Sequence, residues 1–135
     1  MGQELMSSVT MGGLAAVGIG AAVGAWIRWG LGLMLNTLHP TIPLGTLVAN
    51  LVGGYLIGLA MGLFASNTPS PELRLLMTTG FLGGLTTFSA FSAEAIALMQ
   101  RHEYGWATVH ISSHVIGSLL MTALGFMTIQ WIRGH

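Results

Sequence analysis

The fold of this chain is decided by the stretch Gly83-Gly84-Leu85-Thr86-Thr87-Phe88-Ser89-Ala90-Phe91. Two adjacent glycines and two adjacent threonines are poor helix formers, yet they interrupt a segment that is long and apolar enough to span a membrane. In hydrocarbon, irregular backbone is tolerated only where protein buries it or where it lines a polar path. The stretch therefore predicts a membrane helix that breaks at residues 83–86, with an ion site or a permeation path beside the break.

The composition indicates a protein whose surface faces lipid. Of 135 residues, 53% are hydrophobic and only 6% are charged, with a mean hydropathy of +0.75; soluble domains carry about 25% charged residues. Four basic residues balance four acidic ones, so no basic patch for nucleic acid is expected. The chain has no cysteine, which excludes disulfides, thiolate chemistry and zinc–thiolate sites.

Four segments are long enough to cross about 30 Å of hydrocarbon, which takes roughly 20 helical residues. They cover about residues 10–36, 44–65, 73–100 and 104–132, and the segments between them are rich in proline and polar residues. Glycines recur at four-residue spacing in the first three segments, which is typical of closely packed membrane helices. We therefore predict an all-α membrane protein with a single four-helix domain over residues 1–135.

The arginines give no preferred orientation in the membrane. With both termini on one side, Arg74 and Arg133 lie on that side, while Arg101 lies on the other and Arg28 lies nearer to it. Because the bias of lysine and arginine sets topology, this balance favours insertion in both orientations and an antiparallel homodimer. The alternative is that so few charges carry no topological signal.

The last segment carries a polar stripe in which His110, His114, Ser118 and Thr122 recur every four residues. This spacing aligns them on one helix face, about 6 Å apart. Hydroxyls and imidazoles can all donate hydrogen bonds, so the stripe favours a path for a dehydrating anion, with hydrogen bonding between helices as the alternative. A metal site or a proton relay at the two histidines is also open, but no third metal ligand is near in sequence.

Other polar and aromatic residues could share that path. Asn50 lies inside the second segment, where its amide either faces an ion or fixes helix register. Phe88 and Phe91 share a helix face, and the positive edges of their rings suit weak contact with an anion. Arg28 and Glu94 either pair with each other or lie near the ends of a pore, and Arg28 could also snorkel to the interface.

The chain resembles the Fluc (CrcB) family of small fluoride channels, and the resemblance covers all four segments in order. Four motifs carry it: Gly24-Ala25-Trp26-Ile27-Arg28-Trp29, Gly45-Thr46-Leu47-Val48-Ala49-Asn50, Gly80-Phe81-Leu82-Gly83-Gly84-Leu85-Thr86-Thr87-Phe88-Ser89-Ala90-Phe91-Ser92, and Gly117-Ser118 followed by Thr122.

The resemblance implies a dual-topology homodimer with two antiparallel pores and a structural sodium ion at the dimer centre. It assigns that ion to the backbone carbonyls of Gly83 and Thr86. The residues predicted to line the anion pore are Asn50, Phe88, Phe91, His114, Ser118 and Thr122. Those predicted in its vicinity are Arg28, Thr46, Thr87, Ser89 and Glu94. The resemblance itself implies Asn50, the two phenylalanines, Ser118, Thr122, Arg28 and Glu94. One departure is Ala90, where the family usually has threonine or serine.

The predicted function is passive, selective export of fluoride across a bacterial inner membrane, without enzymatic chemistry. Selectivity for fluoride is implied by the resemblance, whereas composition alone predicts only a small-anion path. The alternative is a small dual-topology drug/proton antiporter, for which Glu94 is the one candidate carboxylate inside a span. A structural subunit without transport activity is a third class, and it leaves the polar stripe and the helix break without a common cause.

Overall fold

The computed structural model describes residues 1–3 and 9–134, and it confirms an all-helical membrane fold with a broken third helix. Within the described residues, four helical stretches are long and apolar enough to cross a membrane. They are α2 (Met11–Leu35), α3 (Leu44–Phe64), the composite third stretch Pro71–Gln100, and α7 (Tyr104–Ile132). The chain is therefore a multi-pass membrane protein.

Side chains cap the helices where the sequence turns. Thr10 accepts a hydrogen bond from Gly13 N at 2.8 Å and begins α2. At the next turn, Asn36 Oδ1 accepts from Gly45 N at 2.8 Å and from Thr46 N at 3.3 Å. These two amides belong to the first turn of α3, whose amide groups have no partner within the helix. Asn36 therefore joins the end of α2 to the start of α3.

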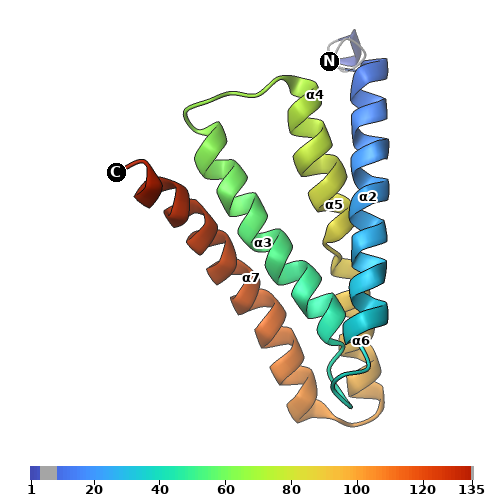
Figure 1. The fold of residues 1–135 in the computed structure, drawn as a ribbon. Helices are drawn as coiled ribbons and strands as arrows, with labels where there is room; N and C mark the ends of the chain where they lie inside the picture. The colour runs from blue at the N-terminus through green and yellow to red at the C-terminus, as the bar shows by residue number, and fades with distance from the viewer. Residues whose placement is uncertain (4–8, 135) are drawn as a thin grey trace.

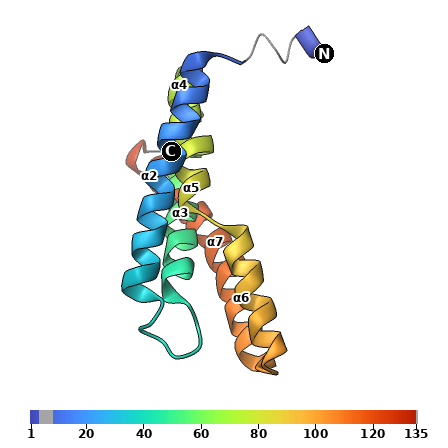
Figure 2. The ribbon, with the colours of Figure 1, turned by 90° about the vertical axis from the view of Figure 1, so that its right-hand side faces the viewer.

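The third stretch consists of four helical pieces. It begins with α4 (Pro71–Arg74), widens into the π-helix η1 (Leu75–Leu82), narrows again in α5 (Gly83–Leu85) and resumes as α6 (Phe88–Gln100). Figure 2 shows that α6 leaves the line of the preceding pieces and runs beside α7. The π-helix was not among the elements predicted from the sequence.

The break lies later than predicted. Gly83 and Gly84 are helical, and the extended residues are Thr86 (φ −89°, ψ 156°) and Thr87 (φ −150°, ψ 118°). Extended backbone suits the β-branched threonines, and Thr86 Oγ1 donates to Leu82 O at 2.8 Å. Thr87 Oγ1 caps α6 by accepting from Ala90 N at 3.0 Å. The threonines form the break, and the glycines have a different role.

The glycines bring helix backbones into close contact. A Cβ at Gly84 would collide with the backbone carbonyl of Ala21, and one at Gly24 would collide with that of Phe81. The same is true between α3 and α7, where Gly58 and Gly125 each face backbone of the other helix. The glycine spacing thus predicted close packing correctly: α2 lies along η1 and α5, and α3 lies along α7, as Figure 1 shows.

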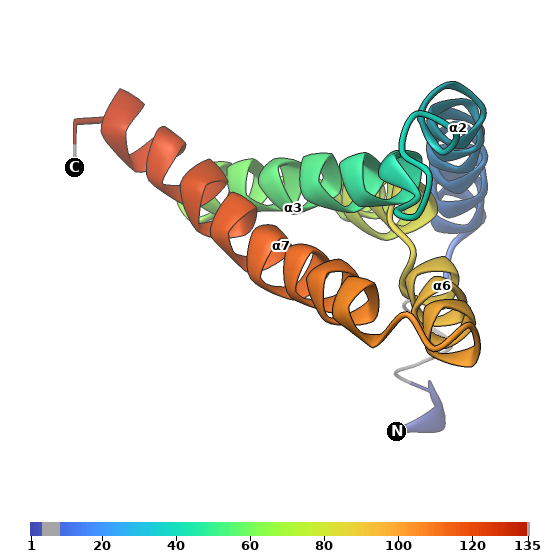
Figure 3. The ribbon, with the colours of Figure 1, turned by 90° about the horizontal axis from the view of Figure 1, so that it is seen from below.

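The helices form an open arrangement rather than a closed bundle. Seen from below in Figure 3, α3 and α7 extend away from α2, and among the described helices α2 makes no contact with α7. Two small cores stabilise the arrangement: Ala49 with Leu82 and Leu85, and Ile42 with Leu98 and Ala107. Many large apolar side chains are exposed on the single chain, as expected for surfaces that face lipid or another membrane helix.

Candidate functional site

A cavity of roughly 400 Å³ lies at the break in the third helix. It is bounded by α3, the break, the start of α6 and the middle of α7. Five residues that the sequence predicted for the pore line it together with both threonines of the break and two apolar residues. The lining residues are Asn50, Thr86, Thr87, Phe88, Phe91, His114, Val115, Ser118 and Leu119.

Asn50 holds the break in place. Its Oδ1 accepts from Thr87 N at 2.8 Å, and its Nδ2 donates to Thr87 O at 3.0 Å. The side-chain amide thus pairs with both polar groups of one backbone residue, which would otherwise be expensive to leave unpaired inside a membrane. Nδ2 also lies 3.0 Å from His114 Nδ1. The predicted alternatives for Asn50 are therefore not exclusive, since it lines the cavity and fixes the backbone.

The two phenylalanines occupy different environments. Their ring centroids are 5.4 Å apart at an interplanar angle of 60°, but Phe88 is 78% exposed and Phe91 is 8% exposed. Phe91 stacks on His110 with centroids 5.3 Å apart and an interplanar angle of 25°, and it lies 4.7 Å from the ring of His114. A histidine ring therefore covers one face of Phe91, which also lines the cavity.

The predicted polar stripe on α7 divides into three parts. His114 and Ser118 line the cavity. His110 is fully buried beside Phe91, with its Nε2 3.3 Å from Phe91 O. Thr122 is not among the lining residues, and its hydroxyl donates to Ser118 O at 3.0 Å. This geometry agrees with the packing alternative for Thr122, and its place on an ion path stays a prediction.

Arg28 and Glu94 have separate partners. Arg28 Nε donates to Gly84 O at 3.0 Å, within α5. Glu94 Oε2 accepts from Thr46 Oγ1 at 2.7 Å, and Glu94 Oε1 lies 3.5 Å from His110 Nε2. The pairing of Arg28 with Glu94, one of the predicted alternatives, is therefore wrong. Each side chain instead contacts polar groups of other helices, with Glu94 accepting a hydrogen bond through Oε2 only.

The break also diverts the donors of two backbone carbonyls. In a continuous helix Gly83 O would accept from Thr87 N, and Thr86 O would accept from Ala90 N. Here Thr87 N donates to Asn50 and Ala90 N donates to Thr87 Oγ1. Gly83 O and Thr86 O thus lack the donors that a continuous helix would supply. Carbonyl oxygens in this condition fit a hard cation such as sodium.

Some parts of the site were missed from sequence. Val115 and Leu119 line the cavity beside the polar side chains. The available signal was that each follows a residue of the stripe by one position. Ser89, predicted near the pore, lies next to the break, where its hydroxyl is 3.3 Å from Thr87 Oγ1.

Comparisons with known proteins match nearly the whole chain. The family described as "CrcB-like protein, Camphor Resistance (CrcB)" matches residues 15–126. A "Fluoride-specific ion channel FluC" of Nitrosospira multiformis is 58% identical over 123 residues, which is 90% of this chain and 96% of the relative. Proteins of the same name from Cupriavidus pinatubonensis and Pseudomonas putida are 62% and 60% identical, covering 86% and 90% of this chain and 93% and 97% of their own. The chain belongs to the CrcB-like protein family.

Proposed function

We propose that this protein is a passive fluoride channel rather than an enzyme. The relatives named above are fluoride-specific ion channels. The observation that carries the proposal is the cavity at the helix break, where the two phenylalanines meet Ser118 and Asn50 without an arginine or lysine among the lining residues. Rapid conduction needs contacts that are favourable enough for entry and weak enough for exit, and neutral donors with ring edges meet that need.

Four of the lining residues have a stated part in this proposal. The hydroxyl of Ser118 donates to the ion, and the edges of Phe88 and Phe91 replace part of its hydration shell. Asn50 keeps Thr87 extended through its hydrogen bonds with the Thr87 backbone. The N–H of Asn50 that faces His114 is the one that would donate a hydrogen bond to a passing anion. The anion path thus depends on Asn50 both for its shape and for a donor.

We further propose that two antiparallel copies make the functional unit, with two pores and a sodium ion on the shared axis. Gly83 is exposed on the single chain, and Phe88 is exposed at the edge of the cavity. A second copy would cover both. Gly83 O and Thr86 O would bind the sodium ion, whose charge would offset the dipoles of carbonyls without donors. In the bacterial inner membrane this channel would export fluoride from the cytoplasm.

The decisive experiment measures anion release from liposomes that contain the purified protein. Fluoride should escape when a potassium ionophore balances its charge, and chloride under the same conditions should stay trapped. Equal release of chloride would refute selectivity. Uptake of a cationic dye driven by a proton gradient would instead support the drug/proton antiporter.

Orientation needs a separate measurement. A C-terminal protease site should be cut in about half of the chains from one membrane face and in the rest from the other. Cleavage from a single face would refute the dual-topology proposal and leave the flux result untouched.

A further inference from the structure

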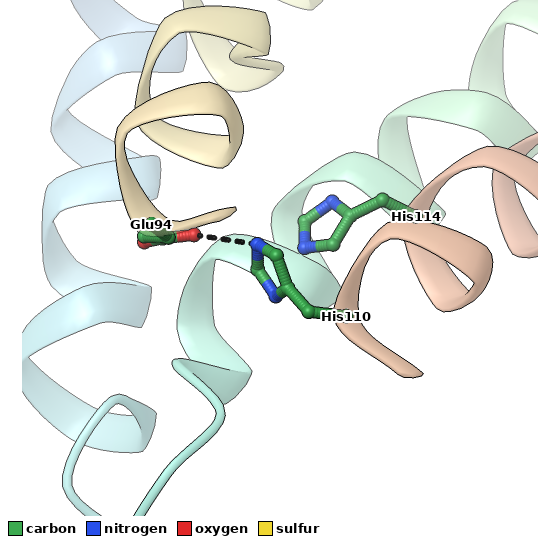
Figure 4. A group of neighbouring side chains, drawn as sticks. All are labelled: Glu94, His110 and His114. Atoms are coloured by element: carbon green, nitrogen blue, oxygen red, sulfur yellow. Dashed lines mark ion pairs between the residues drawn. The ribbon is translucent and has the colours of Figure 1, made fainter. Parts of the chain in front are cut away.

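A cluster of three side chains lies between α6 and α7, beside the cavity. Glu94, His110 and His114 each offer one possible metal-ligand atom, and these atoms lie within 4.8 Å of one another. Figure 4 shows the carboxylate of Glu94 on α6 pointing toward the two imidazoles on α7. His110 and His114 are 0% and 4% exposed. The sequence offered two histidines without a third ligand, and the change of direction at the break supplies it.

The cluster holds polar atoms that the hydrogen bonds around it do not satisfy. Among the residues that the structure describes, Glu94 Oε1, His110 Nδ1 and His114 Nε2 are buried without a hydrogen-bond partner. Buried polar groups almost always have partners, and inside a membrane the cost of leaving them unpaired is high. Two of these atoms, Glu94 Oε1 and His114 Nε2, face the middle of the cluster, and their lack of partners needs an explanation that the anion path through Ser118 and the phenylalanines does not give.

We propose that Glu94, His110 and His114 form a binding site for a divalent transition-metal ion of the zinc class. Two imidazoles and one carboxylate match the three protein ligands of zinc sites that keep one coordination position open. Imidazole suits transition-metal ions such as zinc, whereas calcium and magnesium prefer oxygen ligands. Two ligand atoms that each lie about 2.1 Å from a tetrahedral zinc ion are about 3.4 Å from each other. Glu94 Oε1 and His110 Nε2 are already 3.5 Å apart, so small rotations of the side chains close the site.

Metal binding at His114 would act on the break through Asn50. The Nδ1 atom of His114 lies 3.0 Å from Asn50 Nδ2. When a metal takes the lone pair of Nε2, the ring proton resides on Nδ1, so Nδ1 can no longer accept from the Asn50 amide. The loss of one neutral hydrogen bond is small beside the free energy of zinc binding. The same amide holds Thr87, and the metal site is thereby coupled to the backbone that shapes the cavity.

The charge of the ion gives the expected consequence, which rests on the proposed fluoride channel. One carboxylate and a divalent cation leave a net positive charge beside the cavity, and the open position on the metal can accept an anion. An anion held there leaves slowly, contrary to what conduction requires. Zinc should therefore slow fluoride release.

The test uses the full chain purified with an affinity tag that contains no histidine. Zinc binding is measured by equilibrium dialysis, and cobalt binding by visible absorption, which reports tetrahedral ligands. The variants are Glu94→Gln, His110→Gln and His114→Gln. The matched control is His102→Asn, because His102 is exposed on a loop with φ 58°, a conformation that asparagine adopts readily.

We expect one zinc ion per chain in the wild type and in the His102→Asn control. Each of the three ligand variants should bind zinc more than about tenfold more weakly, since loss of an outer-shell partner alone costs that much. Absence of binding in the wild type, or equal binding in the ligand variants and the wild type, would overturn the proposal. An X-ray absorption spectrum of the zinc-loaded wild type tests the site without any variant. A zinc ligand shell that contains no imidazole would also overturn the proposal.

Fluoride release is then compared with and without zinc for each protein. The rate of release with zinc, divided by the rate without zinc, should fall below one in the wild type and the control. This ratio should stay near one in any ligand variant that conducts. Release in the presence of a chelator reports on the proposed channel function alone. Failure of the channel proposal is therefore distinguishable from failure of the metal site.

Discussion

Replacing Asn50 with alanine tests whether this side chain shapes the path rather than only touching the ion. The change removes its contacts with Thr87 N, Thr87 O and His114 Nδ1, at 2.8, 3.0 and 3.0 Å. Hydrogen bonds between membrane helices average about 0.6 kcal/mol, which gives about 2 kcal/mol for three. The unpaired Thr87 N–H adds up to about 3 kcal/mol. We expect Asn50→Ala to lower the free energy of unfolding by about 2–5 kcal/mol and to abolish fluoride release.

The matched control is Tyr55→Phe, on the same helix. Its hydroxyl is 3.0 Å from Thr128 Oγ1, so the variant loses one contact between α3 and α7 away from the break, at a cost of about 0.6 kcal/mol. Unfolding of both variants is followed by titration with a denaturing detergent in mixed micelles. If Asn50→Ala loses no more stability than Tyr55→Phe while release is abolished, Asn50 acts only as a donor to the ion and the argument for its structural role is refuted.

Three further predictions follow from packing and exposure. A Cβ at Gly84 would collide with backbone of α2, whereas an added Cβ at Gly30 meets nothing within 4 Å; Gly84→Ala should cost about 1–3 kcal/mol and Gly30→Ala should be neutral or stabilising, as unfolding titrations will measure. Phe88→Ile should cut fluoride release strongly with little loss of stability, because Phe88 is 78% exposed, whereas Phe91→Ile should also destabilise the chain, because Phe91 is 8% exposed; equal stability losses would contradict this contrast. Ala90→Thr adds a hydroxyl at a half-buried position beside Thr87, so it should alter the rate of release without changing stability, and an unchanged rate would assign the position to packing.

The sequence was sufficient for the spans because their signal is local. Each is a long apolar run bounded by polar or proline-rich segments, and the length needed to cross a bilayer fixes the count. Close packing at the glycine pairs could also be predicted, since four-residue spacing places Gly80 and Gly84 on one helix face. In the structure both glycines pack against the backbone of α2.

The exact position of the break could not be predicted from such a local signal. Low helix propensity marked the whole stretch from Gly83 to Thr87, but propensity is a weak signal that tertiary contacts override. The contact that decides is with Asn50, which is 37 residues away from Thr87 in the chain. The glycines stay helical because α2 needs their lack of a side chain, and the threonines leave the helix because Asn50 pairs with the exposed backbone.

The grouping of Glu94 with His110 and His114 depends on the same contact. A straight third helix would continue along α2, where α4, η1 and α5 already lie, whereas α6 turns toward α7. That turn brings Phe91 onto His110 and places Glu94 within 3.5 Å of the same imidazole. The pairing of Asn50 with Thr87 therefore fixes three things at once: the cavity, the two carbonyls without helical donors, and the ligand cluster. Loss of the Asn50 amide should therefore be felt at all three, because each depends on the extended backbone at Thr87.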